Sequence, residues 1–234
     1  LIRKSVWEEV KGLDEQAFRV SYNDVDLCLK VRERGYKILW TPFVVLVHHG
    51  ILHPNKGNDL IIRALAEMRS EFPQLHFLLV GDGPEMDRLR HLVQELNMTD
   101  VCTLTGWLPT LTDVCCALNA GNVGLVMRTG AESDDFHMTG ALVHAMACGL
   151  PILAARLGGV SEVVVEDRNG LLFAPTDMPE FQRQLTRFIR EPDLRARCGQ
   201  VAAEDAKIHF DIQRVTDATV QPLLRLAGID VVAS

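Results

Sequence analysis

The sequence of 234 residues contains no apolar run close to the roughly 20 residues that a membrane-spanning helix needs. Its first residues lack the long apolar stretch of a signal peptide. Positive charge is also scarce: the formal net charge is −7, whereas a face that binds nucleic acid must be basic. These absences argue against a membrane-spanning protein, a secreted precursor and a nucleic-acid-binding protein.

The cysteines lack the spacing of a zinc site. None of the six belongs to a Cys-x-x-Cys pair, and most stand in apolar stretches. This distribution is typical of reduced core thiols, so we expect a cytoplasmic protein without a metal site. The cysteines are Cys28, Cys102, Cys115, Cys116, Cys148 and Cys198.

Apolar runs alternate with amphipathic segments from about residue 44 to the C-terminus. The runs are continuous rather than alternating, which is typical of strands that helices cover on both faces of a parallel sheet. The pattern predicts an α/β fold with a Rossmann-like, doubly wound parallel sheet over residues 44–234. Residues 1–43 are charged and turn-rich, and they predict a short α-rich extension. Ligands of such sheets bind outside the carboxyl ends of the strands.

Two predicted strand-to-helix turns could hold an anion. In the first, HHGILHPNKGND over residues 48–59, Gly50 and Gly57 allow close backbone approach and Lys56 supplies a cation beside a helix start. In the second, RLGGVSE over residues 156–162, Gly158 and Gly159 precede a helix. A plain turn with a surface lysine remains the alternative for the first. A third turn, VGDGPE over residues 80–85, favours a structural interpretation.

Several motifs in a fixed order carry a family resemblance. They are the turn from Gly50 to Gly57, LLVGDGPE, LTGWLP, HAMACGLPILAARLGGVSEVV, NGLLFAPTD and DLRARCGQVA. The stretch from about residue 50 to residue 205 thus resembles the C-terminal half of GT-B glycosyltransferases, in particular the retaining, nucleotide-sugar-dependent family 4. The resemblance implies a UDP- or GDP-sugar donor, a saccharide or lipid-linked acceptor, and hexose transfer without a tightly bound metal or other cofactor. It also implies peripheral membrane association through a partner domain that has no counterpart in these residues.

The resemblance assigns roles to single positions. In the family, a Gly-Arg pair and a lysine several residues on grip the donor diphosphate, and the lysine assists catalysis. The glycine matches Gly50 and the lysine matches Lys56, but Ile51 stands where the family has arginine. Arginine offers a bidentate fork to a diphosphate, and isoleucine offers none. Two family glutamates, for the donor sugar and the ribose, fall at Phe136 and His144. His144 could donate to a ribose oxygen or be an ordinary helix histidine.

Other positions follow from the same resemblance. The diglycine loop would line the sugar pocket, and the segment after LTG would flank the base through backbone groups. A shifted register could restore an acid near residue 136. The loop residues are Gly158, Gly159, Val160 and Ser161, the base-flanking residues are Trp107 and Leu108, and the nearby acids are Glu132, Asp134 and Asp135.

Residues 1–43, with the strand that follows, resemble the end of a family 2 glycosyltransferase of the GT-A type. The family's catalytic base would map to Asp24, and its metal-binding histidine to His48 or His49. Asp24 and Asp26 could instead be charges that complement a helix N-terminus. Because the nucleotide-binding half of that family is absent here, we expect this block to be a structural remnant.

Three functions follow for testing. The leading hypothesis is a glycosyltransferase domain that binds a nucleotide sugar. The second is a non-catalytic binding or interaction domain, which Ile51 and His144 favour. The third, a flavodoxin-like regulatory domain, requires an acidic cluster at the strand ends and no diglycine loop, and the sequence contradicts it.

Overall fold

The computed structural model describes residues 44–130 and 139–226, together with Glu9, Lys11, Lys30 and Arg34. The chain separates into two compact units, Leu1–Pro42 and Phe43–Ser234. In the first unit, Arg34 Nε lies 3.6 Å from Glu9 Oε1, and Arg34 Nη1 donates to the Lys30 carbonyl at 3.2 Å. Asp24 lies outside the described residues.

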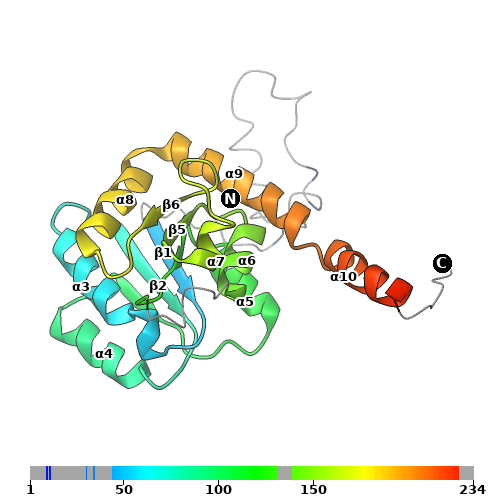
Figure 1. The fold of residues 1–234 in the computed structure, drawn as a ribbon. Helices are drawn as coiled ribbons and strands as arrows, with labels where there is room; N and C mark the ends of the chain where they lie inside the picture. Colours follow the sequence, from blue (N-terminus) through cyan, green and yellow to red (C-terminus); the bar gives the residue numbers. More distant parts are fainter. Residues whose placement is uncertain are drawn as a thin grey trace. The chain divides into compact units, whose positions relative to one another are not determined.

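The described part of the second unit is built on a parallel sheet of six strands in the order β3-β2-β1-β4-β5-β6 (Figure 1). The prediction of a doubly wound parallel sheet is therefore confirmed. Strand order reverses between β1 and β4, which pair along Leu46–His48 and Val123–Leu125. The strands are β1 Val44–His49, β2 Leu75–Val80, β3 Cys102–Leu104, β4 Val123–Val126, β5 Ile152–Ala155 and β6 Gly170–Phe173.

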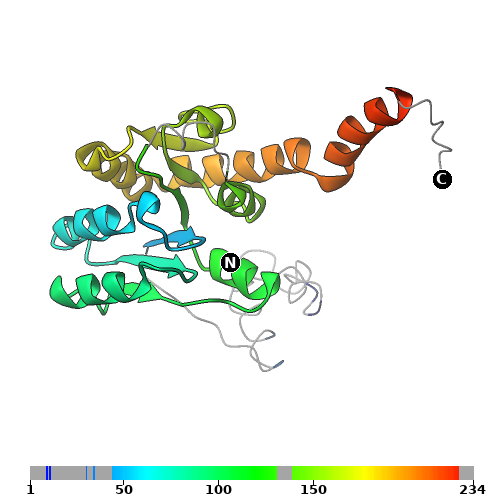
Figure 2. The ribbon, with the colours of Figure 1, turned by 60° about the horizontal axis from the view of Figure 1, so that its bottom comes forward.

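Helices cover both faces of the sheet (Figures 1 and 2). One core contains Leu46 of β1 and side chains of α3, α4 and α8, and the other contains Val47 and side chains of α5 and α6. Successive residues of a strand point to opposite faces, so both must be apolar. The helices are η1 Pro54–Lys56, α3 Asn58–Met68, α4 Met86–Glu95, α5 Leu111–Leu118, α6 Gly140–Ala147, α7 Gly158–Ser161, α8 Met178–Arg190, α9 Pro192–His209 and α10 Ile212–Leu226.

The last two helices differ in how they pack. Helix α9 runs along the sheet and buries Leu194, Cys198, Ala202 and Ala206. Helix α10 continues beyond it, away from the sheet in both views, and its residues up to Val220 are exposed (Figures 1 and 2). Among the described helices, none is long and apolar enough to cross a membrane.

Candidate functional site

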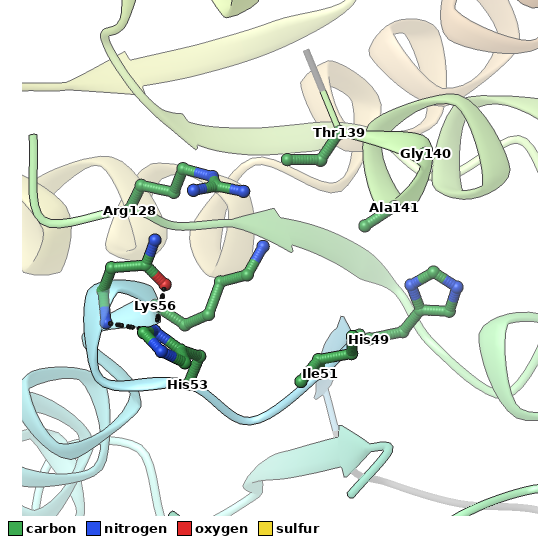
Figure 3. A pocket seen from close by; sticks show the side chains of 10 residues that line it. His49, Ile51, His53, Lys56, Arg128, Thr139, Gly140 and Ala141 are labelled. Carbon is green, nitrogen blue, oxygen red and sulfur yellow. Dashed lines mark hydrogen bonds between the residues drawn. The ribbon is translucent and has the colours of Figure 1, made fainter. Parts of the chain in front are cut away.

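A pocket of about 480 Å³ opens where β1 and β4 end, at the reversal of strand order (Figure 3). At such a point the connections that leave two neighbouring strands turn to opposite faces of the sheet, and this leaves a crevice for a ligand outside the carboxyl ends. The described lining residues come from the loop after β1, the end of β4 and the start of α6. They are His49, Gly50, Ile51, His53, Asn55, Lys56, Arg128, Thr139, Gly140 and Ala141.

The loop after β1 packs against the turn after β2. Gly50 N donates to Val80 O at 2.9 Å, and a Cβ on Gly81 would lie 2.1 Å from Gly50 O. A Cβ on Gly83 would likewise lie 2.5 Å from Leu52 O. The glycines of VGDGPE therefore let two loops pack against each other, and that turn has a structural role.

Lys56 ends the 3-10 helix η1, and the next residue, Gly57, adopts φ of +58° and is the N-cap of α3. The side chain of Lys56 is 9% exposed and extends into the pocket (Figure 3). Its position two residues before the start of α3 places the ammonium near the positive end of the helix dipole. Two of the predicted residues, Gly50 and Lys56, are thus brought together in the pocket.

The opposite wall contains a cation that sequence reasoning missed. Arg128 follows β4 and Met127, and Figure 3 shows its guanidinium directed into the pocket beside Lys56. The start of α6 completes this wall, where Thr139 caps the helix by accepting from Leu142 N at 3.4 Å. The available signal was an arginine directly after a continuous apolar strand.

His49 and His144 form a pair at the edge of the pocket. His49 Nε2 lies 3.1 Å from His144 Nδ1, and the rings meet edge to face at 87°. Burial, and then the charges of His144 and Lys56, lower the pKa of His49, so a neutral ring is favoured. Exposed His144 contacts the lining residue His49 without itself lining the pocket.

His48 faces the interior instead. Its side chain is 1% exposed, and its Nδ1–H donates to Leu125 O at 2.9 Å, which ties β1 to β4. Burial lowers its pKa to about 4. In the described part of the chain, no group of three or more His, Cys, Asp or Glu side chains could hold a metal, and neither His48 nor His49 belongs to one.

The remaining predicted residues lie elsewhere. The diglycine loop forms the short helix α7, with Leu157 at its N-cap, and the base-flanking segment follows β3, with Trp107 exposed and Leu108 half-buried. Neither segment belongs to the described lining of the pocket. Phe136 and the nearby acids Glu132, Asp134 and Asp135 lie outside the described residues.

The pocket is suited to an anion. Lys56 and Arg128 carry positive charge, His49 and His53 add ring nitrogens, and no acidic side chain occurs among the described lining residues. A cleft that has low-dielectric walls and charged groups of one sign concentrates ligands of the opposite sign. This local charge contrasts with the net charge of −7 for the chain.

Comparison with known proteins gives one consistent result. The family model described as "Glycosyl transferases group 1" matches residues 41–205. The chain is 29% identical over 189 residues to the GDP-mannose-dependent alpha-(1-6)-phosphatidylinositol monomannoside mannosyltransferase of Mycolicibacterium smegmatis, a match that covers 80% of this chain and 48% of that protein.

Solved structures agree with the family match. Anabaena HepE in complex with UDP-glucose superposes with a TM-score of 0.69 at 27% identity, over 78% of this chain and 49% of that one. The C-terminal domain of a group 1 glycosyl transferase, LpcC, from Francisella tularensis shares the fold, with a TM-score of 0.63 at 18% identity over 74% of this chain and 89% of that one. The chain spans about half the length of the mannosyltransferase and of HepE. With a GT-B-type Rossmann-like sheet and a family match over most of its length, the chain belongs to the group 1 glycosyl transferases.

Proposed function

We propose that the pocket binds the diphosphate of a nucleoside diphosphate sugar, and that the complete protein transfers the hexose to a saccharide or lipid-linked acceptor. The observation that carries this proposal is the placement of Lys56 and Arg128 in an acid-free pocket, within the described lining, where strand order reverses. HepE was solved with UDP-glucose, and the mycobacterial relative depends on GDP-mannose. The donor is accordingly a UDP- or GDP-sugar.

Within this proposal, Lys56 acts on the leaving group. Cleavage of the bond between the sugar and the diphosphate leaves negative charge on the diphosphate oxygens. A preorganised ammonium at the start of α3 stabilises that charge as it develops, without a metal ion. The first N–H groups of α6, at Gly140 and Ala141, add positive potential on the other side of the pocket.

The finer assignments belong to the same proposal. In the family 4 scheme, the helix from Gly158 to Ser161 positions the sugar, Trp107 and Leu108 flank the base, and Phe136 stands where a glutamate contacts the sugar. In this scheme Nδ1 of His144 accepts from the Nε2–H of His49, so the Nε2–H of His144 is the group that donates to a ribose hydroxyl.

The two parts of the chain have different roles. Residues 44–234 form the donor-binding domain, and residues 1–43 are a remnant of the GT-A type in which Asp24 no longer serves a donor. The protein works in the cytoplasm, and a partner domain outside these residues brings it to the membrane surface.

A second candidate is a binding domain that keeps the donor pocket and lacks transfer activity. Ile51 favours it, because this side chain is 64% exposed and contributes no hydrogen bond where the family resemblance places arginine. The two candidates share donor binding and differ in turnover.

The test is a calorimetric titration of the chain with UDP-glucose and GDP-mannose. We expect saturable binding of one donor, at least tenfold weaker in Lys56→Met, which keeps the apolar stem and removes the charge. Lys207→Met, on the exposed side of α9, is the matched control and should bind normally. Absence of binding at millimolar donor would contradict the proposal.

Turnover separates the two candidates. We expect donor hydrolysis or sugar transfer by the complete wild-type protein that disappears in Lys56→Met and persists in Lys207→Met. Donor binding without turnover would instead support the binding domain.

A further inference from the structure

We propose that Arg128 supplies the guanidinium that position 51 lacks, so that the donor diphosphate is gripped by Lys56 from the β1 side and by Arg128 from the β4 side. This inference rests on the proposed function and assigns a further binding residue to that site. It turns on three observations: the geometry of the pocket, the packing of the two cation-bearing segments, and the side chain at position 51.

The two cations of the pocket extend from adjoining elements. Lys56 ends η1 after β1, whereas Arg128 follows β4, the neighbouring strand in the sheet. Figure 3 shows both side chains entering the same space, with Ile51 on the β1 side of it. A ligand in this pocket is therefore exposed to both cations.

The backbones that carry these side chains are fastened together. Thr129 N donates to Asn55 O at 2.9 Å, which joins the residue after Arg128 to the residue before Lys56. Gly57 packs so closely on the β4 segment that an added Cβ would lie 2.9 Å from Met127 Cε and 3.3 Å from Thr129 Cγ2. Met127 itself is buried. The contact between residues 55–57 and residues 127–129 thus fixes the distance between the Cα atoms of Lys56 and Arg128.

The chemistry requires a second donor group. Lysine acts on a diphosphate as a point charge, whereas the planar guanidinium of arginine can form two parallel hydrogen bonds to phosphate oxygens. Ile51 offers neither a charge nor a donor. Among the described lining residues, Arg128 is the one that carries a guanidinium. Its half-buried position limits the competition of water for the hydrogen bonds of this group.

The experiment compares UDP and GDP with UMP and GMP by calorimetry on folded variants of the full chain. Arg128→Gln should bind the diphosphate about 10- to 100-fold more weakly, the typical range for hydrogen bonds to a charged group, and should lose less affinity for the monophosphate. The diphosphate affinity of Arg128→Lys should fall between those of the wild type and Arg128→Gln, because lysine keeps the charge but lacks the two parallel donors of the guanidinium. A general structural defect would weaken both nucleotides alike.

Arg90→Gln is the matched control. Arg90 is an exposed residue of α4, lies 3.5 Å from Asp87, and is not part of the described lining, so its variant should bind as the wild type does. Ile51→Arg added to Arg128→Gln should recover affinity, because it returns a guanidinium to the pocket from the β1 side.

The outcomes separate the inference from the function beneath it. If the wild type binds a diphosphate and Arg128→Gln binds it equally well, the inference is wrong and the donor pocket stands. If Arg128→Gln weakens both phosphates equally and Ile51→Arg restores nothing, the inference is also wrong. If the wild type binds no nucleotide at millimolar concentration, both fail.

Discussion

His48 is a buried histidine whose pKa of about 4 links folding to pH. In the unfolded chain its pKa returns to about 6.5, so below that pH the unfolded state binds a proton that the folded state refuses. The contribution to stability is complete above about pH 6.5 and declines as pH falls toward 4. The shift corresponds to a loss of about 3 kcal/mol by pH 4.

This linkage is measurable by urea unfolding between pH 7.5 and pH 4. We expect the free energy of unfolding of the wild type to fall more steeply than that of His48→Asn, whose amide can still donate to Leu125 O. The variant is less stable at pH 7.5 because it fills less of the core. Parallel pH curves for the two proteins would show that His48 titrates normally.

The sequence predicted only those pocket residues that lie together in one loop. Gly50 and Lys56 stand in one strand-to-helix turn, so the family motif and helix electrostatics both pointed to them. Arg128 stands far along the chain, and the pairing of β1 with β4 brings it to that turn. No local pattern contains that pairing, which depends on non-local packing of the sheet.

At the scale of elements, a buried network joins α9 to the turn before β6. Asp205 is 4% exposed and accepts from Arg168 Nη1 at 2.6 Å, Arg168 Nη2 at 2.8 Å and Asn169 Nδ2 at 2.7 Å. Burial raises the pKa of Asp205, but the hydrogen bonds from Arg168 and Asn169 outweigh it, and the net pKa is lowered. The network therefore holds α9 against the sheet in the ionised state.

Asp205→Ala should lower the free energy of unfolding at pH 7 by about 2–3 kcal/mol, because the Asn169 amide and the Arg168 guanidinium lose their shared acceptor. Glu204→Ala, the exposed neighbour on the same helix, should change it by less than about 0.5 kcal/mol. Chemical denaturation of both variants measures the difference. Equal effects would mean that the network adds nothing to the packing of α9.

Elements were more predictable than their arrangement. Apolar continuity and alternation marked the strands and helices, because burial on two faces imposes that pattern. The motif NGLL, which helped to identify the family, has its asparagine fully buried, with its side chain bonded to Val165 N, Val163 O and Asp205. Sequence alone does not distinguish such a packing motif from a ligand motif, since both demand specific residues.

At the scale of the molecule, the sheet and the helices packed on it should fold without the rest of the chain. These elements lie between Val44 and His209, whereas the described side chains of α10 are exposed up to Val220. A chain of residues 43–210 should unfold cooperatively, within about 1 kcal/mol of the full chain. Ending the chain at residue 191 removes the buried residues of α9 and should abolish cooperative unfolding. A non-cooperative transition for residues 43–210 would contradict this division.

All the parallel strands end at the same edge, which bears on how such a site can change during evolution. A functional group attached to the end of one strand can be replaced by a group at the end of its neighbour, while the ligand keeps its place. Ile51 and Arg128 fit such an exchange between β1 and β4. A sequence alignment read one position at a time records isoleucine at position 51 as the loss of a binding group. It also treats arginine at position 128 as an ordinary surface substitution. Relatives with an apolar residue at the first position are therefore best judged by the charge gathered along the edge, summed over its loops.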